Sequence, residues 1–353
     1  MMARLGDVVE ISASKKNISD SEIWLLNLDM VEQRTGNIIE YNYVSKDDLS
    51  GSIIQFDSDN VLYSKLRPNL NKVVVPNQDG FATSEMLPLR PNTAMLTKEF
   101  LAAYLRSDNF VTWAVSKTAG AKMPRLGTKE LLNKDIPLPS IDKQLEITSV
   151  LAQIENLISL RKQQLAKLDE LVKARFVEMF GEKISQEKGY RHSTLGAIYK
   201  FQYGKGNNIP ESKGDYPVYG SNGQVGYHTE YNSEDAPIIG HIGAYAGIVN
   251  WGEGKHFVTY NGVICKLTNE FVNKKYGYYC LLMANLQNEV RGGSQPFVSY
   301  DLLVKPQIFI PPLDIQNQFA IFVEKVDESK LTIQQSLDKL EMLKKALMQE
   351  YFG

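Results

Sequence analysis

Two short polar segments in the first half of the chain concentrate cationic and amide side chains. The segment "YSKLRPNLNK" (residues 63–72) places them around a proline, and "KTAGAKMPRL" (residues 117–126) adds three further cations. Arg and Lys can pair with phosphate or with guanine edges, and Asn can bond adenine in two places. The candidate DNA-binding residues here are Lys65, Arg67, Asn69, Asn71, Lys72, Lys117, Lys122 and Arg125.

Comparable segments recur in the second half. They read "YGKGNNIP", "YGSNGQVGYH", "GHIGAYAG" and "RGGSQPF", and they combine glycine with amides, hydroxyls and aromatic rings. The candidate DNA-binding residues here are Lys205, Asn207, Asn208, Tyr219, Ser221, Asn222, His241, Tyr245, Arg291, Ser294 and Gln295. For any single residue, an ordinary hydrophilic loop is the alternative interpretation.

The usual motifs of catalytic sites do not occur in the sequence. There is no phosphate-binding G-x-x-x-x-G-K-[ST], because "GEGKHF" (residues 252–257) lacks the first glycine and the hydroxyl residue. The G-x-G-x-x-G turn, the nucleophile motif Gly-x-Ser-x-Gly and the Asn/Asp-Pro-Pro-aromatic tetrapeptide of amino-methyltransferases are also missing. The four histidines lack metal-ligand spacing, and two cysteines make no disulfide framework. We therefore expect a non-catalytic chain with no metal or cofactor of its own.

Composition places the chain among ordinary globular proteins. Its 353 residues are 43% hydrophobic and 23% charged, enough for about two domains with real cores. No apolar run approaches the roughly 18 residues of a membrane span, and "MMARLGDVVEIS" lacks the apolar core of a signal peptide, so we expect a cytoplasmic protein. The net charge of −2 weighs against nonspecific polyanion binding. A few cations gathered by folding would still suffice to recognise bases.

The chain also repeats itself. When Gly181 is laid over Gly353, residues 135–181 align with residues 307–353 without a gap. Identical pairs include Pro139 with Pro311, Gln144 with Gln316 and Phe180 with Phe352. Upstream, "GAKMP" matches "GGSQP", "RLGDVVEI" is similar to "TLGAIYKF", and "GFATSEMLPL" is similar to "HFVTYNGVIC". The chain therefore consists of two halves whose ends stayed alike while the preceding regions diverged.

Each copy of the repeat predicts a long helix with a heptad seam. Each begins after a proline-rich junction and ends at a glycine. The predicted helix-pairing residues are Ile147, Leu151, Ile154, Ile158, Leu165, Leu168 and Val172 in the first copy and Phe319, Val323, Val326, Ile333, Leu337, Leu340 and Leu347 in the second. Charged residues interrupt the seams at Arg161, Arg175, Lys330 and Lys344. Two such seams in one chain favour an antiparallel coiled coil over a seam completed by another protein.

The remaining regions predict a mixed α/β (α+β) fold. Short β-rich runs such as "NVLYSKL", "NKVVVP", "APIIGHIG", "AGIVNW" and "GVICKL" are separated by loop residues. One helix per region is expected, near residues 98–116 and 274–290. The predicted segments are a globular region at 1–140, a helix at 141–181, a second globular region at 182–312 and a second helix at 313–353. Antiparallel helices would place the two globular regions at opposite ends.

Taken with "SKLRPN", "AKMPRL", "IPLPSIDKQ", "IPPLDIQNQ" and the duplicated helix, the whole chain resembles the specificity subunit of type I restriction-modification enzymes. The resemblance implies two target-recognition domains, each recognising one half of a split DNA sequence, and two antiparallel spacer helices in a pseudo-twofold repeat. It also implies partners: two modification subunits that methylate adenine with S-adenosylmethionine, and restriction subunits that use ATP and Mg. His241 stands where many members of that family have Arg.

Two other hypotheses remain open from the sequence. One is a specificity subunit of a related bipartite restriction system that cuts on both sides of its site. The other is an adaptor that assembles through its coiled coil and binds protein ligands through its loops.

Overall fold

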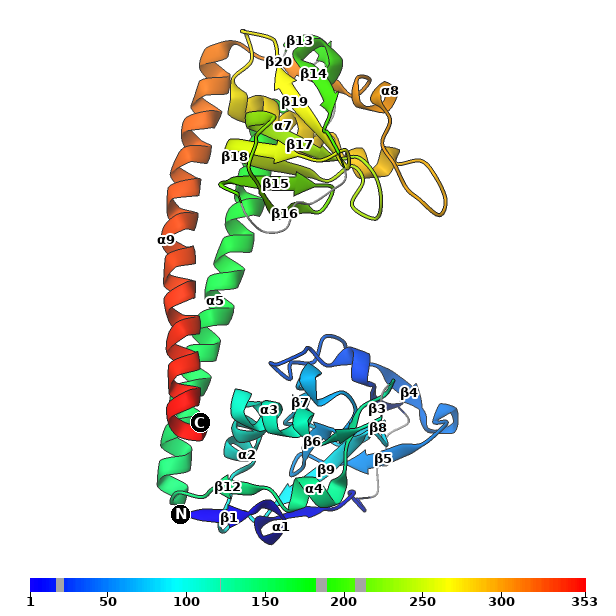
Figure 1. Ribbon diagram of the computed structural model, residues 1–353, viewed down its shortest axis with the longest axis vertical. Helices are drawn as coiled ribbons and strands as arrows, with labels where there is room; N and C mark the ends of the chain where they lie inside the picture. The colour runs from blue at the N-terminus through cyan, green and yellow to red at the C-terminus, as the bar shows by residue number, and fades with distance from the viewer. Residues whose placement is uncertain (17–21, 121, 182–188, 207–213) are drawn as a thin grey trace. The chain divides into compact units, whose positions relative to one another are not determined.

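A computed structural model (Figure 1) describes residues 1–16, 22–120, 122–181, 189–206 and 214–353. The chain forms two compact units, Met1–Lys162 with Gln335–Gly353, and Gln163–Gln334. Each unit contains a globular region and parts of both long helices, α5 (Ile141–Phe180) and α9 (Leu313–Phe352). The predicted mixed α/β class and the two long helices are confirmed, while the four segment boundaries stay a prediction. Among the residues described, no helix combines the length and apolarity that crossing a membrane requires.

Two four-stranded sheets organise the globular region of the first unit. Their strand orders are β2-β9-β6-β7 and β4-β3-β8-β5. The strands are β2 (Val9–Ile11), β3 (Glu22–Leu26), β4 (Tyr43–Ser45), β5 (Ile53–Phe56), β6 (Val61–Ser64), β7 (Val73–Val74), β8 (Gly80–Thr83) and β9 (Met86–Pro91). All four residues of β6 are buried, because this strand is internal to its sheet and packs in the same core as the helix that follows β9.

That helical region is two helices, so the single helix predicted near residues 98–116 is wrong. The helices are α2 (Lys98–Arg106) and α3 (Asp108–Ser116). Ser107 separates them with extended backbone at ψ 145°, and its hydroxyl oxygen accepts a hydrogen bond from Phe110 N at 3.2 Å. The same hydroxyl donates to Tyr104 O at 2.7 Å. Serine therefore ends one helix and caps the next, as short hydroxyl side chains commonly do.

Short elements complete the first unit. They are α1 (Leu5–Val8), α4 (Thr128–Leu132), the 3-10 helices η1 (Leu28–Met30), η2 (Lys46–Asp48) and η3 (Pro68–Leu70), and the strands β1 (Met2–Arg4), β10 (Thr118–Ala119), β11 (Arg125–Leu126) and β12 (Asp135–Pro137). β1 pairs antiparallel with β12, and β10 pairs antiparallel with β11.

A six-stranded sheet organises the second unit, in the order β14-β19-β17-β18-β15-β16. The strands are β14 (Tyr199–Tyr203), β15 (Tyr216–Gly220), β16 (Gly223–His228), β17 (Ser233–Gly240), β18 (Val249–Val258) and β19 (Gly262–Leu267). Its remaining elements are α6 (Leu195–Ile198), α7 (Lys274–Met283), η5 (Leu286–Glu289), α8 (Tyr300–Leu303), β13 (Arg191–Thr194) and β20 (Gln307–Ile310). The helix predicted near residues 274–290 ends earlier than expected, because Asn285 adopts left-handed backbone at φ 48°.

The repeat is visible where each globular region meets its long helix. β1 pairs with β12 in the first unit, and β13 pairs with β20 in the second. Leu5 N donates to Lys134 O at 2.8 Å, and Leu195 N donates to Pro306 O at 3.0 Å. A Cβ on Gly196 would lie 2.7 Å from Val304 Cβ. The "LG" pair shared by both halves therefore marks a close approach of backbone.

In each unit, apolar residues of the long helices join the core of the globular region. In the first unit the Phe352 ring lies 5.2 Å from the Phe100 ring, and in the second the Phe176 ring lies 5.7 Å from the Tyr276 ring. The heptad pattern did not select Phe176, Phe180 or Phe352, because these residues follow the globular cores rather than the seam. Of the predicted pairing residues, those that are buried are Ile147, Leu151, Ile154, Val172, Phe319, Val323, Val326 and Leu337, and those that are half-buried are Ile158, Leu165, Leu168, Ile333, Leu340 and Leu347.

Two of the charged residues that interrupt the seam form ion pairs between α5 and α9. In the first unit, Lys344 Nζ lies 2.8 Å from Glu155 Oε1, and Lys162 Nζ lies 3.2 Å from Glu341 Oε1. In the second unit, Lys330 pairs with Asp169. Along the first two pairs the residue number rises on α5 and falls on α9. The two helices therefore run antiparallel within the first unit.

Candidate nucleic-acid interface

A left-handed turn shapes the segment around Pro68 in the first unit. Pro68 begins the 3-10 helix η3, and the two residues that flank this helix, Arg67 and Asn71, have φ of 49° and 46°. Such backbone costs a residue with a side chain about 1–2 kcal/mol. Arg67 is exposed, and no hydrogen bond or ion pair joins its guanidinium to another described residue. The turn thus holds an unpaired cation at the surface on an unfavourable backbone conformation.

The two polar segments predicted in the first unit lie side by side. Arg67 N donates to Pro124 O at 2.8 Å, and Leu126 N donates to Lys65 O at 2.9 Å. Between these bonds, Leu66 and Arg125 form an isolated antiparallel bridge. We call residues 65–72 together with residues 117–120 and 122–126 the first loop pair.

Not every candidate in the first loop pair faces solvent. Those that are exposed are Arg67, Asn69, Lys117 and Lys122, while Lys65 is half-buried. Asn71 is only 5% exposed, and its Nδ2 donates to Arg106 O at 2.9 Å. The Lys72 ammonium donates to Leu28 O, and burial lowers the pKa of Lys72. Asn71 and Lys72 therefore stabilise the loop from inside.

Arg125 differs from Arg67 because a carboxylate holds it. Arg125 Nη2 lies 2.9 Å from Glu85 Oε1, and Arg125 Nε lies 3.1 and 3.2 Å from the two Glu85 oxygens. The hydrogen bond from Arg125 lowers the pKa of the Glu85 carboxyl. To bind a phosphate or a base in the same way, Arg125 must leave this partner, whereas Arg67 needs to leave none.

The second unit contains an equivalent arrangement. Gly243 N donates to Pro296 O at 2.8 Å, and Val298 N donates to His241 O at 3.0 Å. Between these bonds, Ile242 and Phe297 form an isolated antiparallel bridge. We call residues 241–247 and 291–298 together the second loop pair. Each contact has its counterpart in the first loop pair.

Left-handed residues also occupy matching positions in the two loop pairs. Gly243, at φ 94°, takes the place of Arg67, and Gly247, at φ 82°, takes the place of Asn71. Gly120 and Gly292, which the repeat aligns, have φ of 98° and 96°. The two loop pairs therefore share one backbone frame and differ in the side chains that the frame presents.

The candidates of the second unit are distributed as follows. Those that are exposed are Lys205, Asn222, Tyr245, Arg291, Ser294 and Gln295, those that are half-buried are Tyr219 and Ser221, and those outside the described residues are Asn207 and Asn208. His241 is only 7% exposed, and its Nδ1 lies 3.2 Å from Tyr260 O. Arg291 lies 3.8 Å from Asp301, a long and exposed contact.

Several of these residues converge on the turn at residues 258–261. Lys205 N donates to Val258 O at 3.0 Å, Thr259 N donates to Tyr219 O at 2.9 Å, and His241 N donates to Asn261 O at 2.8 Å. Lys205, Tyr219 and His241 thus come together from three different strands or their ends.

Sequence reasoning did not select two tyrosines at this place. The Tyr203 ring lies 4.5 Å from the His241 ring, and the Tyr260 ring lies 5.3 Å from it. Tyr203 is 38% exposed and Tyr260 is 44% exposed. Half-exposed aromatic rings can stack on bases or cover sugar surfaces. The available signal was the position of Tyr203 at the start of "YGKGNNIP".

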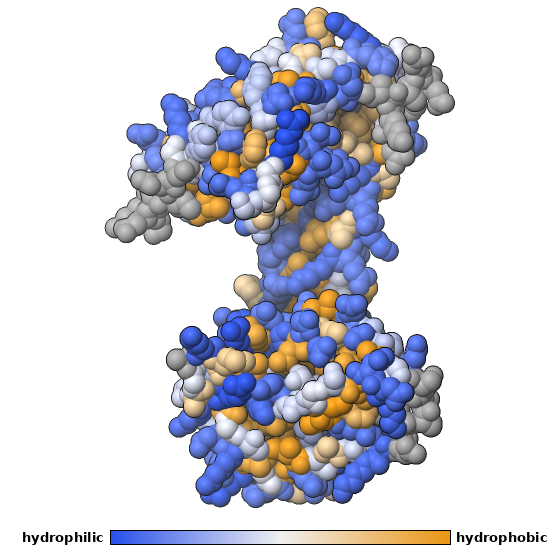
Figure 2. All heavy atoms as spheres, turned by 90° about the vertical axis from the view of Figure 1, so that its right-hand side faces the viewer, coloured by the Kyte–Doolittle hydropathy of each residue, from blue (hydrophilic) through white to orange (hydrophobic). Residues whose placement is uncertain are grey.

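On the side drawn in Figure 2, hydrophilic residues interrupt the apolar ones on the surface of both units. Large unbroken apolar patches mark protein or membrane contacts more often than nucleic-acid contacts. This face of each unit therefore has the mixed polarity of an ordinary protein surface.

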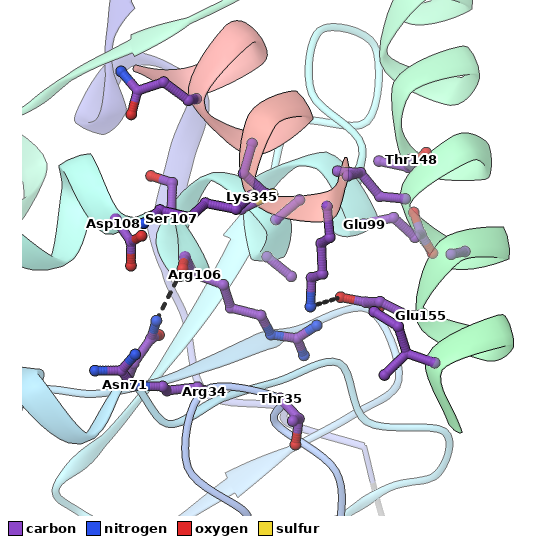
Figure 3. Close-up of a pocket in the computed structure, with 18 of the residues that line it drawn as sticks. Arg34, Thr35, Asn71, Glu99, Arg106, Ser107, Asp108, Thr148, Glu155 and Lys345 are labelled. Carbon is purple, nitrogen blue, oxygen red and sulfur yellow. Dashed lines mark hydrogen bonds and ion pairs between the residues drawn. The ribbon is translucent and has the colours of Figure 1, made fainter. Parts of the chain in front are cut away.

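A pocket of about 690 Å³ within the first unit is lined in part by Asn71 of the first loop pair. In Figure 3 the Arg106 side chain extends into it, and the dashed line from Asn71 marks the bond to the Arg106 carbonyl. Arg106 Nη2 also donates to Val73 O at 2.8 Å. Burial lowers the pKa of the Arg106 guanidinium, and the charge of Glu155 opposes this effect. Arg106 therefore connects the wall of the pocket to the left-handed turn.

Cys265 and Cys280 are both buried as free thiols. Burial raises the pKa of the Cys280 thiol to about 12 and raises that of Cys265 as well. Both thiols are therefore protonated near neutral pH. Within the same described part, no three His, Cys, Asp or Glu residues are grouped to hold a metal ion.

Known proteins resemble the chain over both halves. The EcoDI specificity subunit of Escherichia coli is 25% identical over 152 residues, which cover 43% of this chain and 34% of that protein. The chain thus matches about a third of that relative's length. The putative MjaX specificity subunit of Methanocaldococcus jannaschii is 22% identical over 370 residues, which cover 94% of this chain and 84% of the relative.

Solved structures share the fold. The S subunit of a type I restriction-modification system from M. genitalium has a TM-score of 0.64 at 14% identity, covering 100% of this chain and 96% of that one. A chain from work on complex assembly and conformational transition of the type I system has a TM-score of 0.61 at 16% identity, covering 100% and 97%. The profile of the type I restriction modification DNA specificity domain matches residues 1–170 and 188–342. Because this profile spans both halves, the chain belongs to the family of type I restriction-modification specificity subunits.

Proposed function

We propose that each loop pair recognises one half of a split DNA sequence. The observation that carries this proposal is the shared backbone frame: the same left-handed turn carries the exposed Arg67 and Asn69 in the first unit, and Gly243 and the exposed Tyr245 in the second. A common frame with different side chains suits two domains that do one task on two different base sequences.

Chemistry on the DNA then belongs to partner subunits. Two modification subunits would bind S-adenosylmethionine and methylate adenine, and restriction subunits would use ATP and Mg to translocate and cut. The long helices would carry these partners, in the cytoplasm. Support comes from the family of the chain and from its similarity to a solved chain from work on complex assembly of the type I system.

A map of methylated adenine across a genome tests the proposal. Long-read sequencing would compare cells expressing this chain with its neighbouring methyltransferase against cells expressing the methyltransferase alone. We expect a two-part motif, with a fixed number of unspecified bases between its halves, that appears only when the chain is present.

Two outcomes would contradict this function. If an active methyltransferase produces no new motif with the chain, an adaptor that binds protein ligands becomes the better explanation. If the motif appears but the associated nuclease cuts on both sides of it, the chain serves the related bipartite system instead.

A further inference from the structure

Gln144 lies in the first turn of α5 and is completely buried. Its Oε1 accepts a hydrogen bond from Thr97 N at 2.9 Å, and its Nε2 donates to Met95 O at 2.8 Å and to Pro139 O at 3.0 Å. Thr97 is the N-cap of α2, where its hydroxyl accepts from Phe100 N. One amide therefore joins three backbone groups, two in the globular region and one in the junction before α5.

Gln316 repeats this arrangement in the second unit. It is also completely buried, in the first turn of α9. Its Oε1 accepts from Asn273 N at 2.8 Å, and its Nε2 donates to Phe271 O at 3.0 Å and to Pro311 O at 2.8 Å. Asn273 is the N-cap of α7, the counterpart of Thr97. The same three bonds occur in two units whose globular sheets differ. This indicates that the bonds serve what the units share, namely the attachment of a globular region to a long helix.

Glutamine suits this site better than other amino acids of similar size or shape. The site needs one acceptor and two donors at the end of a three-carbon reach, and the glutamine amide supplies both. Glutamate has the reach but lacks the N–H donors, asparagine is one methylene shorter, and leucine forms no hydrogen bonds. A buried amide with both groups satisfied also avoids the cost of an unpaired polar atom.

Other polar contacts between a globular region and the long helices lie nearer the surface: Asn109 Nδ2 donates to Phe352 O at 2.9 Å, and Lys275 Nζ lies 2.8 Å from Asp327 Oδ2. Much of the remaining contact is apolar. In the first unit, Ile147, Leu151 and Phe352 pack against the core, and in the second, Val172, Phe176 and Phe319 do so. Hydrophobic packing favours contact without fixing direction, whereas hydrogen bonds depend steeply on angle. The glutamine bonds are the directional contacts that are completely buried and repeated in both units, which makes them suited to orient each globular region on its helix.

We propose that Gln144 and Gln316 are positioning residues that fix the angle of each recognition domain on its own helix and so set the spacing between the half-sites. This role rests on the proposed function, because it concerns how far each loop pair extends along the DNA. A domain free to tilt about its apolar contacts would move its loop pair relative to the helix that carries it. The expected result is recognition with more than one spacing.

The test replaces each glutamine by leucine in the full chain, expressed with its methyltransferase partner. Gln144→Leu removes the bonds of the first unit, and Gln316→Leu removes those of the second. Gln153→Leu is the matched control, because Gln153 is exposed on α5. Methylated adenines are mapped as above, and the fraction of sites with a spacing one base longer or shorter than the wild-type motif is counted.

We expect each buried variant to raise the fraction of off-spacing sites at least tenfold, and Gln153→Leu to leave it unchanged. A purely structural role would instead lower methylation at all sites while keeping one spacing, and that result would overturn the proposal. If Gln144→Leu does not fold, Gln144→Asn replaces it: mixed spacing supports the role, and one spacing refutes it. Failure of the proposed function differs, because the wild type would then give no two-part motif at all, and the positioning role would fall with it.

Discussion

The two loop pairs share a backbone frame but place different residue types at its first left-handed position. Where the second unit has Gly243 at φ 94°, the first has Arg67 at φ 49°. Glycine adopts this conformation without steric penalty, while arginine accepts about 1–2 kcal/mol of strain. Residues held in strained conformations often have functional roles. This comparison leads to the hypothesis, tested below, that the Arg67 guanidinium contacts DNA and that the second unit uses other side chains.

The largest effect is expected at the second left-handed position of the frame. In Gly247→Ala, the new Cβ would lie 2.7 Å from Gln287 N, and the alanine would have to adopt left-handed backbone at φ 82°. Backbone strain and overpacking together should lower the free energy of unfolding by about 3 kcal/mol or more. Thermal unfolding of the purified chain measures this.

The matched change in the first unit is Asn71→Gly. It removes the bond to Arg106 O but relieves left-handed backbone. The loss should therefore be smaller than for Gly247→Ala. A loss as large as that of Gly247→Ala would mean that the bond to Arg106 stabilises the fold by much more than the left-handed backbone costs.

Replacing Arg67 by glycine copies the second unit into the first. Arg67→Gly should weaken binding of the assembled complex to its DNA by about 1–3 kcal/mol, because a good base contact by arginine contributes that much. Stability should stay the same or rise, since the strain is relieved. Fluorescence anisotropy with duplexes mutated in one half-site, together with a melting curve, separates the two effects. Unchanged affinity for every duplex would remove Arg67 from the interface.

A smaller effect is expected for Gly243→Ala. A Cβ there would meet no atom within 4 Å, so the cost is that of backbone conformation alone, about 1–2 kcal/mol. Denaturant unfolding measures it. A loss well above this range would show that the frame of the second unit tolerates no side chain at this position for another reason.

The smallest effect concerns the partner of Arg125. The hydrogen bond from Arg125 lowers the pKa of Glu85 in the folded chain, so the stability it contributes is present above the unfolded-state pKa and is lost as pH falls through the folded-state pKa. The melting temperature of Glu85→Gln should therefore lie below that of wild type near neutral pH and approach it in acid. Phe297→Leu changes the counterpart of Arg125 in the second unit, where no such ion pair is described, and should show no such pH dependence.

Local sequence pattern and composition were enough to predict the fold class and the long helices. The repeat could be predicted from aligned identities, and the two long helices from their heptad pattern. The β-rich runs could be predicted from short apolar stretches between loop residues. Arg67 and the loops around it were selected because their residue types suit DNA. Their role in binding stays a prediction.

Features that depend on distant contacts were beyond sequence reasoning. Asn71 and His241 look like their exposed neighbours, yet they are buried by Arg106 and by Tyr203 and Tyr260. Ser107 interrupts a stretch with helical periodicity because its hydroxyl competes for backbone groups. Gln144 was noticed as identical to Gln316, but its three partners became known only in the folded chain.

The ion pairs between the long helices affect how α5 and α9 are aligned along each other. An apolar heptad seam by itself fits almost as well after sliding by seven residues, since the pattern recurs. In the first unit, Lys344 lies beside Glu155, and a slide of one heptad along α5 would bring it beside Lys162, which now pairs with Glu341. Attraction would become repulsion between like charges. Within the first unit, these ion pairs thus disfavour a shift of α9 by one heptad along α5 in this direction.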